Sequence, residues 1–295
     1  MLEALTMVRI APVVFVCLWA TGFVGARYSM PHAEPASFLS LRFAIAFAIL
    51  GLVALLVKAE WPRGRALIDV IAVGALVHGI YLGGVFWAVR NGMPGGVSAV
   101  IVGLQPLLTA IMAALWINER VSMRQWLGIG LGLAGIAMVL VPKFDLNADG
   151  INVVTTIACL ISVFAIAAGT VYQKRNVTHV DLRSGTALQY VGAFIPTSLF
   201  ALMFESYAID WNADSIFALL WLVFVLSIGA IFLLMWLIRE GSVAQVSSLF
   251  FLVPAVAALM TWYLFGETLN LVQIAGIIVC AIAVAIASAK PKVAA

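Results

Sequence analysis

The sequence has few charged residues. Asp, Glu, Lys and Arg make up 10% of its 295 residues, whereas a soluble domain carries about 25%. Hydrophobic residues account for 64% of the chain, and the mean hydropathy is +1.14. A soluble fold of this length cannot cover so much apolar surface, so the composition predicts an all-α polytopic membrane protein.

Cysteine is scarce as well. Cys17, Cys159 and Cys280 each lie inside an apolar run, so we expect neither a disulfide framework nor a metal site, and no cofactor. The formal net charge of +3 would suit a nucleic-acid partner, but the basic residues form short clusters between apolar runs. They are better explained as topology signals. The expected partners are a small-molecule substrate and the lipid bilayer, and not nucleic acid.

No Asp or Glu falls at mid-depth in any apolar run. A proton- or sodium-coupled transporter usually exposes a carboxylate there. An intramembrane enzyme needs a nucleophile–base pair, a metal cluster or an acid dyad at that depth. No His-Glu-x-x-His or Gly-x-Ser-x-Gly motif occurs either, so we expect that the protein is not an enzyme.

Long apolar runs are what the chain has instead. A spanning helix needs about 20 mostly apolar residues. The first run lacks a small-residue cleavage site, so we interpret it as a retained helix and not as a signal peptide. Ten segments qualify as spans: 8–27, 38–57, 68–90, 95–116, 125–141, 152–173, 184–204, 216–238, 243–264 and 271–288.

The loops between these spans differ in Lys and Arg. If the N-terminus is cytoplasmic, twelve of the sixteen basic residues face the cytoplasm. Only Arg27, Arg90 and Lys143 face outward, and Arg42 lies within the second span. The positive-inside rule therefore predicts that both termini are cytoplasmic.

The two halves of the chain resemble each other. A shift of 148 residues aligns Pro106 with Pro254 and Glu119 with Glu267 without a gap. A shift of 149 aligns FWAVRNG (86–92) with MWLIREG (235–241), and a shift of 147 aligns LRF (41–43) with LQY (188–190). We therefore predict two repeats, 1–142 and 143–295. Five spans in each make the repeats inverted, with a central cavity between them.

Several short motifs follow the same order as in a known family. They are Trp19 with Gly22 and Phe23, the arginine of LRF, the A-x-R-x-G stretch at 88–92, and the ending formed by Pro106, Glu119 and Arg120. Together they resemble the drug/metabolite transporter superfamily, and within it the EamA-type ten-helix exporters. The chain looks most like the YddG-type exporters of aromatic amino acids, which implies a multi-pass protein of the bacterial cytoplasmic membrane.

The chain also departs from that pattern. It has WATG (19–22) where many relatives have Trp-Gly directly. The second half has Gln189 and Thr268 where the first half has Arg42 and Arg120. The two gates of the transporter are therefore not expected to be chemically equivalent.

Polar and aromatic side chains inside the spans are candidates for substrate binding. His78 can bind a carboxylate or change charge near neutral pH, and the alternative is a neutral histidine bonded to a neighbouring helix. Serines and threonines often just bond their own helix backbone. In the fourth span Ser98, Gln105 and Thr109 form a partly polar stripe. The predicted substrate-binding set is Trp19, Thr21, His78, Tyr81, Gln105, Gln245, Ser248 and Phe251.

Three residues are candidates for gating. Pro106 and Pro254 each lie about eleven residues into a span, where we interpret them as helix hinges, with a packing irregularity as the alternative. Arg42 enters its span close to the outer surface, so we favour gating over substrate binding. Glu119 and Glu267 are expected to be helix-end residues.

Glycines recur through the fifth span at 128, 130, 132 and 135. They allow close packing either within the chain or across a dimer. We expect a monomer or a weak homodimer.

These features favour a secondary transporter. It would export small neutral or zwitterionic metabolites, with aromatic or hydrophobic amino acids favoured, by alternating access. The alternative is a multidrug or quaternary-amine exporter of the same fold. Acidic residues in the cavity would favour that alternative, and the predicted spans hold none at mid-depth.

Overall fold

The computed structural model describes residues 2–29, 31–93, 98, 101–140, 152–265 and 270–288. Across these residues the regular secondary structure is helical, and the one β contact is an isolated bridge between Ala33 and Ile209. The boundary predicted between the repeats and the glutamate predicted at 267 lie outside the described residues. The expected all-α class is confirmed for the part of the chain that is described.

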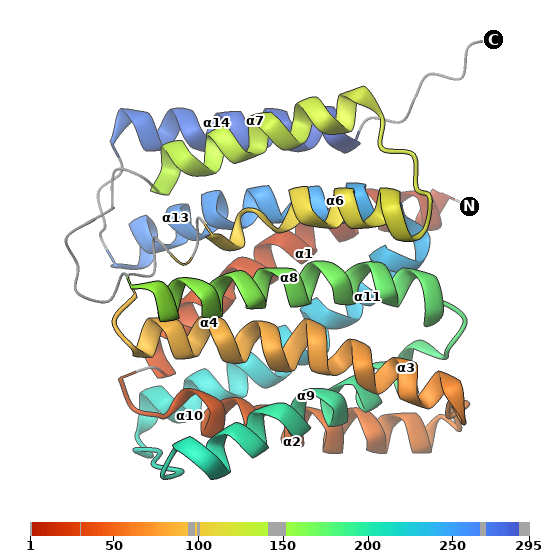
Figure 1. Cartoon of the computed structure of the whole chain (residues 1–295), viewed down its shortest axis with the longest axis vertical. Helices are drawn as coiled ribbons and strands as arrows, with labels where there is room; N and C mark the ends of the chain where they lie inside the picture. The colour runs from red at the N-terminus through yellow and green to blue at the C-terminus, as the bar shows by residue number, and fades with distance from the viewer. Residues whose placement is uncertain are drawn as a thin grey trace.

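In the first half, the helices overlap the predicted spans, and several begin a few residues earlier. They are α1 (Leu2–Ser29), α2 (Pro35–Leu56), α3 (Arg65–Gly74), α4 (Tyr81–Arg90), α6 (Gln105–Trp116) and α7 (Met123–Leu140). A π-helical segment, η1 (Ala75–Ile80), joins α3 to α4 without a break in the chain direction (Figure 1).

The second half is built in the same way. Its helices are α8 (Val153–Asn176), α9 (Leu182–Phe204), α10 (Ala213–Trp221), α11 (Ile231–Glu240), α12 (Val243–Ser248), α13 (Leu252–Phe265) and α14 (Leu271–Ser288). A second π-helical segment, η3 (Leu222–Ala230), joins α10 to α11, and a 3₁₀ turn, η4 (Leu249–Phe251), joins α12 to α13.

Five helical stretches are long and apolar enough to cross a membrane: 35–56, 65–90, 153–176, 182–204 and 213–240. Shorter apolar helices lie beside them, among them Gln105–Trp116 and Met123–Val139. Large hydrophobic side chains such as Leu56 and Met203 are exposed on the outside of the bundle. A contiguous apolar exterior of this kind requires a lipid solvent, so the protein is a multi-pass membrane protein.

The helices lie side by side, with their axes roughly aligned along the bundle (Figure 1). Helices α7 and α14 pack together along one edge, and α2 and α9 pack together along the opposite edge. In Figure 1, helix α1 begins and α14 ends at the same end of the bundle, which we call the terminal end. The segments 31–34 and 205–212 lie at the opposite end, which we call the far end.

Helix starts coincide with side chains that accept hydrogen bonds from the first turn. Asn152 and Asn212 each form a reciprocal capping box, and Asp181 and Ser242 each accept from a backbone N–H at the start of their helix. Such a cap contributes about 0.5–2 kcal/mol. The starts of α8, α9, α10 and α12 are therefore encoded locally in the sequence.

Glycines bring α7 against α14 within the same chain. A Cβ atom on Gly135 would lie 2.7 Å from Cys280 Sγ, and one on Gly128 would lie 2.8 Å from Ala283 O. A Cβ atom on Gly132 would enter the ring of Phe251, whereas nothing lies within 4 Å of one on Gly130. The Gly128–Gly132 motif thus serves packing inside the chain, which was one of the two roles expected for it.

Several contacts between helices repeat when the two halves are exchanged. Helix α8 packs on α3, α4 and α6, and α1 packs correspondingly on α10, α11 and α13. In the α2–α9 pair and in the α7–α14 pair, the two helices occupy equivalent positions in the two halves, so the exchange leaves each pair unchanged. The π-helical segments also correspond, because the shift of 149 that aligns Trp87 with Trp236 places His78 of η1 opposite Ser227 of η3.

The far end is tied together by side chains from both halves. Glu205 accepts hydrogen bonds from the backbone N–H groups of Ala36 and Ser37 at 2.9 and 2.7 Å, so α9 supplies the cap of α2. In the opposite direction, Glu34 accepts from the N–H groups of Ser206 and Ala208 at 2.8 and 3.0 Å. Each segment therefore satisfies backbone donors of the other.

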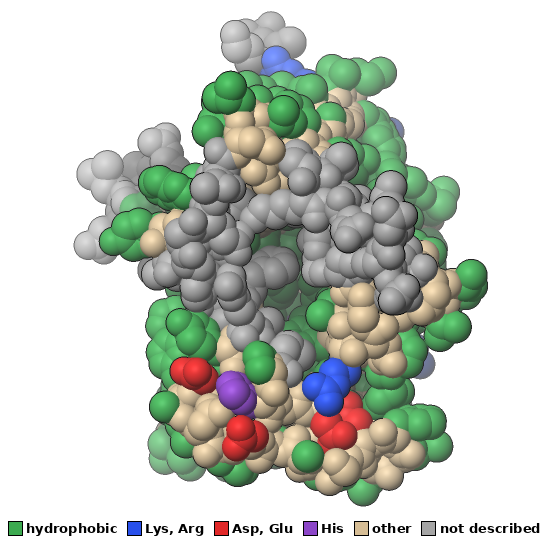
Figure 2. Space-filling model, turned by 90° about the vertical axis from the view of Figure 1, so that its left-hand side faces the viewer, with side chains coloured by type: hydrophobic (Ala, Val, Ile, Leu, Met, Phe, Trp, Pro, Cys, Tyr) green, Lys and Arg blue, Asp and Glu red, His purple; other side chains and the backbone are tan. Residues whose placement is uncertain are grey.

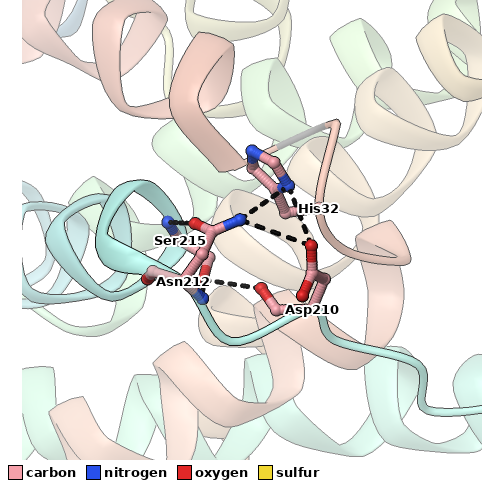
Figure 3. A network of polar contacts seen from close by, with 4 residues as sticks. All are labelled: His32, Asp210, Asn212 and Ser215. Carbon is pink, nitrogen blue, oxygen red and sulfur yellow. Dashed lines mark hydrogen bonds and ion pairs between the residues drawn. The ribbon is translucent and has the colours of Figure 1, made fainter.

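Beside these carboxylates His32 points toward Asp210 and Asn212 (Figure 3). Its Nδ1 lies 2.9 Å from Asn212 Nδ2 and 3.4 Å from Asp210 Oδ2. The Ser215 hydroxyl donates to the Asp210 carbonyl at 2.8 Å. The network fixes the segment 205–212 on the segment that precedes α2.

Candidate substrate site and gates

Trp19 lies in an aromatic cluster. Its ring centroid is 5.3 Å from that of Phe15 and 5.2 Å from that of Phe250, which comes from the other half of the chain. Trp19 also packs against two hydrophobic clusters, one containing Phe250 and the other containing the buried Tyr81. Only part of its surface is covered, so the ring joins these clusters while remaining accessible.

His78 lies against α9. Its Nε2 is 3.4 Å from Gln189 Oε1, and its ring stacks on Tyr190 with centroids 5.3 Å apart. The Gln189 amide then donates to Gln173 Oε1 at 2.9 Å. These contacts match the alternative expected for His78, a histidine bonded to a neighbouring helix.

Three further members of the predicted set have their partners within the protein. The Thr21 hydroxyl donates to the Leu18 carbonyl at 2.6 Å and accepts from Trp221 Nε1 at 3.0 Å. The Ser248 hydroxyl donates to its own helix at the Gln245 carbonyl, at 2.7 Å. The buried ring of Phe251 lies over Gly132 of α7. Of the two adjacent phenylalanines, Phe250 is therefore the one whose ring lies against Trp19.

Gln105 is the member of the set whose polar atoms stay unpaired. Its side chain is 1% exposed, and neither amide atom has a hydrogen-bond partner among the described residues. The hydroxyls of Thr109 and Ser247 are also buried and unpaired within that part of the chain. An unpaired buried polar group costs about 1–3 kcal/mol, so these positions need water or a ligand.

Two of the three unpaired groups lie at the contact between α6 and α12. Val243 at the start of α12 packs in one cluster with Met112 and Ala113 of α6. Because the two helices run in opposite directions from that contact, Thr109 and Ser247 lie at the same level, one turn farther into the bundle. Gln105 lies one turn beyond Thr109. The 3–4 spacing in the sequence found this stripe, although Thr109 and Ser247 were not in the predicted set.

The prolines differ from the sequence prediction. The fourth predicted span is not one continuous helix, because a turn at residues 103–104 precedes α6 and Pro106 lies in the first turn of that helix. Pro254 is the third residue of α13, directly after the 3₁₀ turn. Proline has no N–H to lose in a first turn, so the large interior penalty does not apply there. The breaks themselves occupy equivalent positions in the two halves.

The terminal end is closed by bonds between helices. Glu119, which follows α6, accepts from the N–H groups of Val243 and Ala244 at the start of α12, each at 3.2 Å. Lys174 Nζ donates to the Ile238, Arg239 and Gly241 carbonyls, each at 2.9 Å. Arg239 in turn donates to the Val180 carbonyl. As expected, Glu119 is a helix-end residue.

The far end looks different from outside. Figure 2 shows this face hollowed near its centre, with hydrophobic side chains at the bottom of the hollow. Acidic side chains, a histidine and basic side chains lie at one edge of the same face. The described contacts thus close one end of the bundle, while the other end carries a depression.

Glu34 is the charged group at the far end whose ionisation the fold changes. Partial burial raises the pKa of its carboxyl, but hydrogen bonds from Ala208 and Ser206 and the charge of Arg90 outweigh that effect. The net result is a pKa below the ordinary value for glutamate. The fold therefore favours the ionised form of Glu34.

Arg42 lies inside the bundle, on the face of α2 that meets η3. Its side chain is 4% exposed, and its Nε donates to Ser227 Oγ at 2.8 Å. The guanidinium carbon is 5.8 Å from the centroid of the Phe43 ring, which itself stacks on Tyr190. The Tyr190 hydroxyl donates to the Ser227 carbonyl. Arg42 and His78 therefore belong to one buried polar group around Tyr190.

The sequence pattern of the EamA-like transporter family matches residues 9–141 and, a second time, residues 154–289. The chain belongs to the EamA-like transporter family.

Named relatives agree with this membership. The "Uncharacterized transporter YvbV" of Bacillus subtilis is 27% identical over 94% of this chain and 90% of its own length. The "Probable amino-acid metabolite efflux pump" of Salmonella typhimurium is 26% identical over 88% of each chain. The "Uncharacterized inner membrane transporter YedA" of Escherichia coli K12 is 29% identical over 87% of this chain and 82% of its own length.

A crystal structure shares the fold of this EamA-like chain. It superimposes with a TM-score of 0.80 over 95% of both chains, at 18% sequence identity. At that identity the likeness concerns the architecture alone. Membership of a transporter family also agrees with the expectation that the protein is not an enzyme.

Proposed function

We propose that the protein exports small neutral or zwitterionic metabolites, with aromatic or hydrophobic amino acids preferred, across the cytoplasmic membrane of a bacterium. Two relatives whose names describe amino-acid metabolite efflux support the substrate class. The partly accessible ring of Trp19, set between Phe15 and Phe250, carries the preference for an aromatic or apolar side chain. Such a ring binds a planar group by stacking.

The proposed mechanism is alternating access between two inverted repeats, 1–142 and 143–295. The support is the exchange pattern of the helix contacts, in which α8 stands to the first half as α1 stands to the second. With five segments in each repeat, equivalent segments cross the membrane in opposite directions. The terminal end is then the cytoplasmic end, as the distribution of Lys and Arg predicts.

The breaks beside Pro106 and Pro254 are the proposed hinges. The 3₁₀ turn at 249–251 divides the ninth span into α12 and α13, and the turn at 103–104 precedes α6. Helices α6 and α12 pack together at the terminal end. The unpaired hydroxyls of Thr109 and Ser247 lie at the level of this closing contact, with Gln105 one turn farther in, and these groups would bind water or substrate when it opens. His78, Tyr81 and Gln245 remain proposed contributors to the substrate path.

A cationic-drug exporter is less well supported. Asp69 is a buried carboxylate within a span, but it lies in the second turn of α3, near the terminal end. It accepts from Tyr172 at 2.7 Å and from Arg65 at 2.9 Å. A carboxylate held in this way does not offer its charge to an amine.

The deciding experiment is transport by purified protein in proteoliposomes. Radiolabelled phenylalanine should exchange across the membrane, and Trp19→Ala should reduce that exchange while Trp19→Phe retains most of it. The proposal fails if the folded protein exchanges lipophilic amines and no amino acid, or if Trp19→Ala exchanges phenylalanine at the wild-type rate.

A further inference from the structure

A buried cation without an anion lies between the two repeats. Arg42 presents five N–H donors on its guanidinium, and its acceptor among the described residues is Ser227 Oγ. No carboxylate within that part of the chain lies at ion-pair distance from it. Leaving a charged group buried with most of its donors unused is costly in a membrane protein.

The second half shows the same position in a neutral form. The shift of 147 that aligns LRF with LQY places Gln189 opposite Arg42, and the shift of 149 places His78 opposite Ser227. The Arg42–Ser227 and Gln189–His78 contacts are therefore the same contact in the two repeats. Gln189 has partners for both ends of its amide, since it also donates to Gln173.

The comparison of Arg42 with Gln189 distinguishes a structural role of this position from a ligand-binding role. If the contact only joined two helices, a neutral amide would serve, as it does at Gln189. The first half instead carries a permanent charge at that position and leaves most of its donors for another group. A guanidinium binds a planar carboxylate through two parallel hydrogen bonds.

The position suits a small ligand. Arg42 is the eighth residue of α2, so it lies about 10 Å along the helix axis from the far end. The far end is the face that carries the central hollow (Figure 2). The Phe43 ring lies beside the guanidinium group, and the Tyr190 ring stacks on Phe43.

We infer that Arg42 binds the carboxylate of the exported metabolite, so that the protein selects amino acids or other organic carboxylates over the corresponding amines. The inference rests on the proposed function and specifies its substrate class. It assigns Arg42 a binding role in place of the gating role favoured by the sequence. Ser227 is the positioning residue, because its hydroxyl orients the guanidinium through Nε.

The test compares three ligands that share one ring: phenylalanine, phenylalanine methyl ester and phenethylamine. Binding is measured by the thermal stability of purified protein, because a ligand of the native state stabilises it by mass action. Transport is measured in proteoliposomes. Wild-type protein should bind phenylalanine at least about 10-fold more tightly than the ester or the amine, given the strength of charged hydrogen bonds.

Substitution of the arginine should remove this selectivity. Arg42→Gln, which copies the residue of the other repeat, should weaken phenylalanine binding about 10- to 100-fold and leave amine binding unchanged. The affinity of Arg42→Lys for phenylalanine should lie between those of the wild type and Arg42→Gln, because lysine keeps the charge and lacks the planar guanidinium. The matched control is Arg65→Gln, which removes an exposed arginine at the terminal end and should not change the affinity for either ligand.

Each outcome decides the inference. If Arg42→Gln folds and still prefers phenylalanine by the wild-type factor, the inference is wrong while the proposed function stands. If that variant does not fold, the wild-type ligand series decides, and equal binding of acid and amine overturns the inference. If chloride stabilises wild-type protein as much as phenylalanine does, the site takes an inorganic anion and the inference is again wrong. If the wild type exchanges amines and no amino acid, the proposed function fails as well.

Discussion

Replacing Glu119 by alanine tests whether one side chain holds the terminal end closed. Its carboxylate accepts the N–H groups of Val243 and Ala244, and these donors have no acceptor within their own helix. A hydrogen bond to a charged group contributes about 1.5–3 kcal/mol when buried and short. Glu119 is half-buried and both bonds measure 3.2 Å, so we take about 1 kcal/mol for each. The loss of about 2 kcal/mol shifts the closed-to-open ratio about 30-fold.

Accessibility of Thr109 reports this shift. Its side chain is 0% exposed, and it lies behind the contact that Glu119 caps. In a variant in which Cys17, Cys159 and Cys280 are replaced, Thr109→Cys is labelled with a membrane-impermeant maleimide added from the cytoplasmic side. Glu119→Ala should raise the labelling rate about 30-fold, in proportion to the open population. Glu119→Gln should raise it less, since the amide oxygen still accepts one hydrogen bond.

Glu205→Ala is the matched control. Glu205 caps α2 from α9 with the same chemistry, but at the far end. That variant should lower thermal stability and leave the labelling of Thr109→Cys unchanged. The reasoning is refuted if Glu119→Ala and Glu205→Ala label at the same rate, because the cap on α12 would then be a stability feature without influence on the gate.

Three further predictions follow from neighbouring pairs of residues and from one carboxylate. Phe250→Leu should raise the KM for an aromatic substrate several-fold, since it removes a ring beside Trp19; Phe251→Leu should leave KM unchanged and lower the melting temperature, because that ring packs on Gly132. Gly135→Leu should destabilise the protein by about 1–3 kcal/mol through overpacking against Cys280, whereas Gly130→Leu, with open space around it, should leave the melting temperature unchanged. The lowered pKa of Glu34 means that its contribution to stability is present above the unfolded pKa and is lost as the pH falls through the folded pKa; between about pH 7 and about pH 3 wild-type protein should lose more thermal stability than Glu34→Gln, and parallel losses would contradict the assignment.

Much of the architecture followed from hydropathy, because each spanning helix must bury about 20 apolar residues in lipid. The breaks did not follow from it, since hydropathy averages over the turn at 103–104 and the 3₁₀ turn at 249–251. The sequence did mark the positions of the breaks, through Pro106 and Pro254. Proline disfavours helical geometry in the residue before it and suits a first turn, so the prolines marked helix starts where we had predicted bends inside continuous helices.

The candidate site was predicted only in part. Trp19 and Gln105 were selected because an aromatic ring and an amide at mid-depth each need a partner there. Thr21 and Phe251 were selected by residue type, although their contacts depend on which helix lies opposite. Spacing along one helix cannot supply that information. The repeat alignment could have supplied part of it, because it pairs Arg42 with Gln189 and His78 with Ser227 from the amino-acid sequence alone.

The distribution of close packing indicates which contacts can change during transport. The α7–α14 pair and the α3–α9 contact are held by backbone approaches: a Cβ atom on Gly74 would lie 1.9 Å from Gln189 O, and one on Gly276 would lie 2.8 Å from Gly135 O. Contacts of this kind forfeit roughly a quarter to a half of their dispersion energy when the surfaces separate by about 0.5–1 Å. The α6–α12 contact instead buries the unpaired hydroxyls of Thr109 and Ser247, which become hydrated when the helices part. Opening should therefore cost far less at α6–α12 than at the glycine contacts, which supports the proposed moving part between the breaks and Glu119.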